Sequence, residues 1–214
     1  MGELLTRRRE LALASDSGPI DVGNALTSKS STNTNVWTPS LPIYMPSNTV
    51  VDIYCSFNWK TVAPYASGDT WAQFPLTGSY TVNGDIGHSS SNQNLRYNAG
   101  TTSNKWASIS SWTDKTVVRL SLYQASKYIQ AEFSDGTLSA QSSNQAGAVW
   151  PERTVGLRLH LKYKSYFKRI VQTTGGVVVH DCVPRKLNGV VGMLDLITDA
   201  FVPVTDSDAI ITTI

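Results

Sequence analysis

The chain has few of the residues on which most metal and redox sites depend. Its 214 residues include two cysteines and three histidines. Cys55 and Cys182 are too few for a scaffold held by several disulfides, and the apolar surroundings of Cys55 favour a buried free thiol. The histidines, at positions 88, 160 and 180, lie in different segments, and none has a ligand spacing typical of zinc. The sequence therefore predicts no metal.

Paired catalytic carboxylates are also missing. The only glutamates stand at positions 3, 10, 132 and 152, too scattered for the acidic pair of a glycoside hydrolase. Four aspartates near the C-terminus have the pattern of turn residues: Asp195, Asp199, Asp206 and Asp208. Nucleophile-elbow, phosphate-loop and dinucleotide motifs are absent from the sequence. We expect no enzyme and no cofactor.

Charge and long apolar runs are scarce as well. Charged residues make up 16% of the chain, whereas about a quarter is usual, and the net charge is +2. This balance gives no argument for a nucleic-acid partner. The sequence contains no run of 18 apolar residues and no apolar stretch of the secretory type at its start, so we expect neither a membrane span nor a signal peptide.

Short alternating runs are abundant from about residue 41 onwards. In residues 50–57, Val51, Ile53 and Cys55 share one face of a predicted strand, and Asp52 shares the opposite face with Tyr54 and Ser56. Residues 116–123 and 128–133 predict a hairpin, and residues 177–183 predict a strand that ends before Pro184. Many short antiparallel strands of this kind indicate an all-β sandwich or jelly roll.

The strand with the clearest alternation is expected over residues 154–163. Its leucines face one way and its basic residues the other, so the sequence predicts a solvated basic face. This basic face is formed by Arg158, His160, Lys162 and Lys164, and it is continued along the chain by Lys168 and Arg169. An anionic partner is the alternative interpretation, and the ordinary outer face of a sheet is the favoured one.

The N-terminal 40 residues differ from the rest. Within an N-terminal docking segment over residues 1–20, residues 3–14 predict a short helix, and a breaker follows it at 17–19. Residues 21–40 predict a polar arm. Met1-Gly2 with Thr6 also fits the N-myristoylation pattern, and the arginines could supply a second membrane signal. A helix this short needs a surface to pack on, which favours docking. The candidate docking residues are Leu4, Leu5, Arg7, Arg8, Arg9 and Leu11.

Tryptophans give the chain its only sequence signal for a ligand. Several fall in stretches that look like loops, where an exposed indole can stack on a sugar ring or anchor a protein interface. Burial at the end of the core is the alternative for each of them. The candidate glycan-binding residues are Trp59, Trp71, Trp106 and Trp112.

The C-terminal third resembles the closing segment of LamG-like, concanavalin A-type β-sandwich proteins, which are common in phages and prophages of gut bacteria. The segment 164–204 carries a strand, a turn, Asp-x-Val-Pro, a basic pair and Gly-x-x-Gly-Met-x-Asp before an aromatic residue. The matching residues are Asp181, Val183, Pro184, Arg185, Lys186, Gly189, Gly192, Met193, Asp195 and Phe201. Residues 41–57 and 106–123 are similar to the first strand and central pair of the family.

The resemblance covers roughly residues 41–203 and implies a sandwich domain over 41–214 in a phage virion protein. By analogy with phage fibres it implies a homo-oligomer, most simply a trimer, attached to other virion proteins through residues 1–20 and exposed on the particle. The ending TDSDAIITTI departs from the family's Gly-rich tail, and we expect it to form an extra strand or an intersubunit contact. A free-standing carbohydrate-binding module is the alternative function.

Overall fold

Every element in the described part of the computed structural model is a β-strand. The structure describes residues 23–29, 37–44, 46–57, 70–75, 83–88, 94–99, 105–108, 118–123, 128–133, 138–141, 154–161 and 165–214. All pairings among the strands are antiparallel, so the all-β antiparallel class predicted from the sequence is confirmed. The predicted helix over 3–14 lies outside the described residues.

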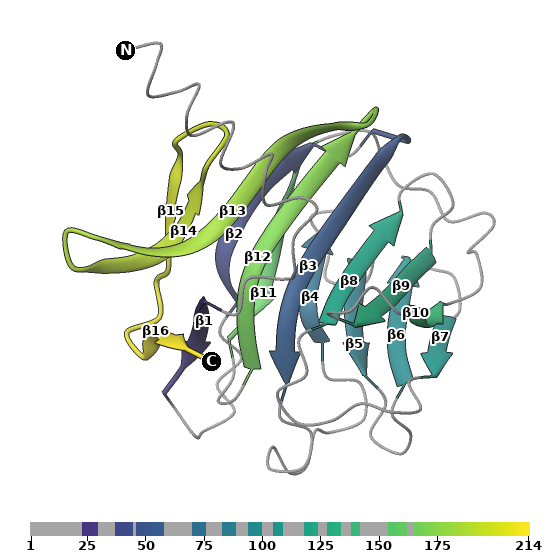
Figure 1. Cartoon of the computed structure of the whole chain (residues 1–214), viewed down its shortest axis with the longest axis horizontal. Helices are drawn as coiled ribbons and strands as arrows, with labels where there is room; N and C mark the ends of the chain where they lie inside the picture. The colour runs from purple at the N-terminus through teal and green to yellow at the C-terminus, as the bar shows by residue number, and fades with distance from the viewer. Residues whose placement is uncertain are drawn as a thin grey trace.

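The strands form two sheets (Figure 1). The ten-stranded sheet has the order β10-β9-β8-β3-β12-β13-β14-β15, with β1 paired to both β12 and β16. Its strands are β1 (Asn24–Ser28), β3 (Thr49–Phe57), β8 (Val118–Tyr123), β9 (Tyr128–Phe133), β10 (Leu138–Gln141), β12 (Ser165–Thr174), β13 (Val177–Leu187), β14 (Val190–Asp195), β15 (Phe201–Pro203) and β16 (Ala209–Thr213).

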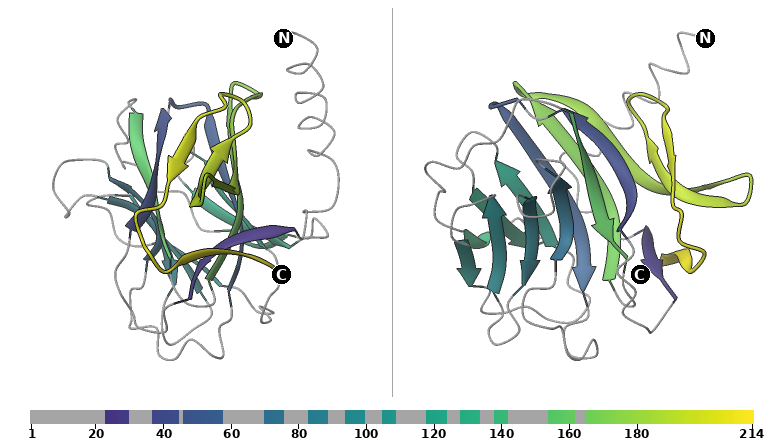
Figure 2. Two further views of the ribbon diagram at one scale, coloured as in Figure 1. Left: turned by 90° about the vertical axis from the view of Figure 1, so that its left-hand side faces the viewer. Right: turned by 180° about the vertical axis from the view of Figure 1, so that it is seen from behind.

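The six-stranded sheet has the order β2-β11-β4-β5-β6-β7 and lies behind the larger sheet in Figure 1. The two views in Figure 2 show the same arrangement from the side and from behind. Its strands are β2 (Trp37–Tyr44), β4 (Thr70–Pro75), β5 (Asn83–His88), β6 (Asn94–Ala99), β7 (Lys105–Ser108) and β11 (Thr154–His160).

Both sheets contribute apolar side chains to the core. On β3, Val51, Ile53 and Cys55 are fully buried, as the alternation predicts, and Leu157 and Leu159 of β11 are fully buried too. The two sheets are also joined by a hydrogen bond, in which Nε2 of Gln172 on β12 donates to the backbone carbonyl of Tyr44 on β2. The core therefore draws on strands that are far apart in the sequence.

Three sequence predictions of local structure are confirmed. The hairpin expected from residues 116–133 is β8–β9, with Leu122 opposite Ile129. Cys55 is a buried free thiol, and Cys182 is also free and buried, so the two do not form a disulfide. The apolar C-terminal ending forms an additional strand, β16, which pairs with β1 in register from Asn24 opposite Thr213 to Ser28 opposite Ala209.

The polar-arm prediction for residues 21–40 did not anticipate the strands there. Within that segment, β1 is buried from Ala25 to Ser28, and β2 begins at Trp37. β1 lies between β12 and β16, with Leu26 opposite Phe167, so both of its edges are hydrogen-bonded. The described part of the segment therefore belongs to the sheets.

The strand expected to stop before Pro184 continues to Leu187, so that prediction was wrong. β13 pairs with β12 as far as Cys182 and then leaves it, while its pairing with β14 continues. From that point one edge of β13 has no strand partner within the described residues. A proline on such an edge removes no ladder hydrogen bond, which explains why the strand can run through Pro184.

The expectation of a solvated basic face over residues 158–169 was also wrong at two positions. His160 is 3% exposed and Lys168 is 4% exposed. Lys168 falls at a β-bulge between Phe167 and Arg169, where one extra residue changes the direction of the side chains. The polar face of β11 is covered at His160. Lys162 and Lys164 lie outside the described residues, so no continuous exposed basic row is observed.

The polar face predicted for β3 is likewise covered in part. Asp52 is 4% exposed and Ser56 is fully buried, although the alternation placed both on the outer side of the strand. Asp52 and Tyr54 do share one side of the sheet, as predicted, together with their register partners Val171 and Arg169 on β12. What the pattern missed is that further parts of the chain cover this side.

Candidate functional site

The densest cluster of polar side chains in the described structure lies where the large sheet divides. Up to Cys182, β13 is paired with β12; beyond it, β13 and β14 form a hairpin that curves away from the sheet (Figure 1). β1 takes the vacated place beside β12, opposite Phe167. We call the side chains at this division the fork network: Arg169, His180, Asp181, Asp195 and Thr198.

Asp195, at the end of β14, is the centre of the fork network. Its Oδ2 lies 2.7 Å from Nδ1 of His180 and accepts a hydrogen bond from Oγ1 of Thr198, also at 2.7 Å. Its Oδ1 accepts hydrogen bonds from the backbone N–H groups of Asp181 and Ile197, both at 3.0 Å. Four donors from two segments, 180–181 and 197–198, therefore converge on one carboxylate that is 5% exposed.

This arrangement keeps Asp195 ionised. Burial alone raises the pKa of the carboxyl, but the hydrogen bonds from His180, Asp181, Thr198 and Ile197 lower it, and the resulting pKa lies well below its usual range. An ionised carboxylate has no proton to give, so Nδ1–H of His180 must be the donor in their contact. The contact fixes the imidazole in one orientation.

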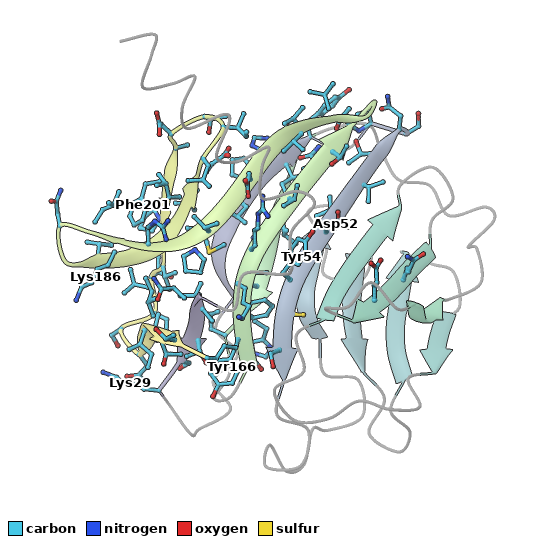
Figure 3. The ribbon with its side chains drawn as sticks, viewed as in Figure 1. Lys29, Asp52, Tyr54, Tyr166, Lys186 and Phe201 are labelled. Carbon is cyan, nitrogen blue, oxygen red and sulfur yellow. The ribbon has the colours of Figure 1, made fainter. Side chains whose placement is uncertain are left out.

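An ion pair stands beside this hydrogen bond. Arg169 of β12 donates from Nε to Oδ1 of Asp181 at 2.7 Å and from Nη2 to Oδ2 at 2.9 Å, so the pair is bidentate. The guanidinium carbon of Arg169 also lies 5.9 Å from the ring centroid of Tyr54 on β3, which Figure 3 labels. The network thus ties β3 and β12 to the start of the departing hairpin.

Cys182 invites comparison with a Cys–His nucleophile, because it lies two residues from His180 and directly opposite Asp195. Burial raises the pKa of the Cys182 thiol strongly, and the negative charges of Asp195 and Asp181 raise it further. A nucleophilic cysteine needs the thiolate, which this environment disfavours. The described residues also contain no group of three side chains that could hold a metal ion. We therefore assign the fork network to positioning.

What the fork network positions is the β13–β14 hairpin. The hairpin closes with a two-residue turn in which Asn188 and Gly189 both have positive φ, at 49° and 85°, as type I′ turns require. Its end carries Leu187 and Val190, 41% and 46% exposed, next to the exposed Arg185 and Lys186. We call these four residues the hairpin tip.

A close contact stiffens the base of the same hairpin. A Cβ atom on Gly192 of β14 would stand 2.4 Å from the carbonyl oxygen of Val202 and 2.5 Å from Cζ of Phe201. Only glycine allows the Phe201 ring to lie across β14 at this distance. β14 is therefore packed tightly against β15, and the hairpin is held from two sides.

The sequence-predicted site residues are mostly not covered by the structure. The docking candidates of the first 20 residues lie outside the described part of the chain: Leu4, Leu5, Arg7, Arg8, Arg9 and Leu11. Trp59 and Trp112 lie outside it too. Trp71 is on β4 and Trp106 on β7, separated in the smaller sheet by β5 and β6, and nothing is established about where their side chains point.

The fork network was missed by the sequence analysis. Asp195 was assigned to a turn and His180 was set aside because it had no metal-ligand spacing. Their meeting depends on the register of β13 with β14, which brings residues 15 positions apart together. The membrane expectation concerns helices, and no described helix is long and apolar enough to cross a bilayer.

Comparison with known proteins adds two distant structural similarities. No protein-family model and no curated protein matches the chain. A crystal structure of scytalido-glutamic peptidase with a transition state analog inhibitor is 12% identical, with 78% of this chain and 88% of that chain covered and a TM-score of 0.40. The native heptameric SAP-like pentraxin from Limulus polyphemus is 9% identical, with 91% of this chain and 97% of that chain covered and a TM-score of 0.42.

Proposed function

We propose that this chain is a structural protein of a phage particle, a component of the head, tail or baseplate that assembles as a homo-oligomer. Its N-terminal segment attaches it to neighbouring virion proteins, and its β-sheet domain is exposed on the particle. In this role Leu4, Leu5 and Leu11 bury apolar surface against a partner, and Arg7–Arg9 pair with acidic groups there. Two features support this proposal: the sequence resemblance, and the exposed hairpin tip of the sheet domain.

The finer fold that we propose is a LamG-like, concanavalin A-type β-sandwich. Two antiparallel sheets of ten and six strands support it, because apolar residues of both are fully buried and Gln172 links one sheet to the other. The segment that carries the resemblance, 164–204, contains the fork network and the hairpin. Asp181, Pro184, Gly192 and Asp195 therefore have physical roles in the same segment.

The observation that carries the assembly function is the exposed hairpin tip. Leu187 and Val190 leave apolar surface in water at the end of a hairpin. The Arg169–Asp181 ion pair, the His180–Asp195 hydrogen bond and a tight glycine contact hold this hairpin in place. Apolar side chains displayed on a rigid projection favour contact with another protein. The fork network fixes the direction of that projection, which a contact element needs.

Light scattering on the full chain tests this function. We expect a mass of a trimer or larger, and a lower mass when Leu4, Leu5 and Leu11 are replaced by aspartate, because charged residues cannot be buried against a partner. A monomeric mass for both proteins would contradict self-assembly through the N-terminal segment.

A glycan array tests the alternative function, a free-standing carbohydrate-binding module. Such a module should bind glycans on an array whether or not the N-terminal leucines are intact. It should lose that binding when an indole of the binding face is removed at Trp59, Trp71, Trp106 or Trp112. Glycan binding by a monomer, lost in one of these alanine variants, would replace the assembly proposal.

A further inference from the structure

The hairpin tip carries an unbalanced positive charge. Arg185 and Lys186 are both exposed, and within the described residues neither forms an ion pair. Among the described residues, the Arg185 guanidinium makes one hydrogen bond, of 3.1 Å from Nη1 to the carbonyl of Pro184. Beside these two cations stand the exposed Leu187 and Val190. The tip is thus a small surface that is both apolar and basic.

A surface of complementary character lies at the start of β16. A hydrogen bond of 2.9 Å from the backbone N–H of Asp208 to Oδ1 of Asp206 closes the turn at 206–208. Because Oδ2 of Asp206 is buried, Asp208 is the exposed carboxylate of this turn. Asp208 is 41% exposed at its side chain, and Lys29 balances it only loosely, with 3.6 Å between Nζ and Oδ1. Ile210, two residues further on, is 37% exposed. We call Asp208 and Ile210 the β16 patch.

The hairpin tip and the β16 patch lie on the same side of the molecule. Figure 1 and the right-hand view of Figure 2 both place the end of β13–β14 and the strand β16 at one edge, and Figure 3 labels Lys186 and Lys29 there. Within the described part of one copy, no ion pair joins the two surfaces. Each is therefore available to another molecule.

We propose that the hairpin tip of one copy docks on the β16 patch of a second copy. The charges match, with Arg185 and Lys186 facing Asp208, and the apolar side chains match, with Leu187 and Val190 facing Ile210. The contact joins two unlike surfaces, so a closed ring satisfies both surfaces of every copy. This inference rests on the proposed homo-oligomer and names its interface within the sheet domain.

A second copy fits this surface better than an unrelated partner because both halves of the contact are present in the one chain. An anionic or cationic partner of another kind would match one surface and leave the other uncovered. The strand next to the patch supports the same choice: β16 contains no proline and no charge, and within the described residues it pairs only with β1. Edges of this kind are usually protected, and a neighbouring copy protects it.

Charge exchange in the full chain tests the contact. In the tip variant Arg185 and Lys186 become glutamate, in the patch variant Asp208 becomes lysine, and the exchanged variant carries all three changes. Self-association is measured by analytical ultracentrifugation. We expect the tip and patch variants each to weaken it by about tenfold and the exchanged variant to regain it, since opposite charges face one another again.

Lys29→Gln should change self-association in the opposite direction from the tip and patch variants. It removes the cation that offsets Asp208, so self-association should tighten. Asp199→Lys, a charge reversal on the β14–β15 turn, is the matched control and should leave the association unchanged. Thermal unfolding of each variant, compared with the native chain, checks that the fold is retained.

Two results would overturn this inference: unchanged association in both single-surface variants, or no recovery in the exchanged variant. Neither result touches the proposed function if the N-terminal aspartate variants still lower the mass of the assembly. If the N-terminal variants lose assembly, and the tip and patch variants also weaken it while the exchanged variant regains it, both contacts are needed.

Discussion

The imidazole of His180 and the carboxylate of Asp195 lie 2.7 Å apart, and this contact joins the middle of β13 to the end of β14. Because Asp195 also accepts the backbone N–H groups of Asp181 and Ile197, it fixes the place where the hairpin leaves the sheet. The fork network therefore determines where the exposed hairpin tip stands, and this links the interior of the domain to its proposed contact.

Replacing Asp195 by asparagine should destabilise the protein by about 2 kcal/mol, since several hydrogen bonds to a charged acceptor are weakened together. Urea unfolding at neutral pH measures the change. Asp208→Asn is the matched control: its ion pair with Lys29 is exposed and 3.6 Å long, so we expect at most a few tenths of a kcal/mol. Equal effects of the two substitutions would contradict the central role of Asp195.

The stability of the native chain should fall as the pH drops below about 4. The pKa of Asp195 is lower in the folded protein than in the unfolded chain, where it is near 3.9. Its contribution is therefore complete above that value and is lost as the pH falls towards the lower folded pKa. Unfolding midpoints from pH 7 to pH 2 should decline less steeply in Asp195→Asn. Parallel curves for the two proteins would show that another group governs acid unfolding.

Neither cysteine should react with a thiol reagent in the native state. Cys55 and Cys182 are buried, and burial raises the pKa of each thiol, so the reactive thiolate is scarce. Titration with Ellman's reagent should report no fast-reacting thiol in the folded protein and both thiols in denaturant. Rapid labelling of Cys182 at neutral pH would reopen the possibility that it acts as a nucleophile beside His180.

Gly192→Ala should destabilise the protein by about 1–3 kcal/mol, because the added methyl group overlaps the carbonyl of Val202 and the ring of Phe201. Thermal unfolding measures this change. Gly189→Asn is the comparison: that position has open space around it, and asparagine tolerates its positive φ, so the effect should be smaller. A silent Gly192→Ala would mean that β15 moves away from β14 without loss.

Alternating apolar residues were sufficient to predict the class of the fold. The buried faces of β3 and β11 and the hairpin β8–β9 follow directly from that alternation. The buried His160, Asp52 and Ser56 could not be predicted in this way, because a period of two says which residues share a side but not whether that side is covered. Lys168 needed knowledge of a bulge, which depends on the partner strand.

The fork network and the hairpin were open to prediction to different degrees. Asn188-Gly189 between apolar residues is a strong hairpin signal that the sequence itself contains. The meeting of Arg169 with Asp181, and of His180 with Asp195, depends on strand register and on the division of the sheet after Cys182. Register of this kind is set by the whole sheet, and no local pattern encodes it.

The central claim is that this chain is a component of a phage particle, and the most direct measurement is to look for it there. Phage particles from a culture that produces the chain would be purified on a density gradient and analysed by peptide mass spectrometry. We predict that its peptides co-purify with the particles in amounts comparable to those of other structural proteins. Peptides confined to the particle-free fractions would contradict the account.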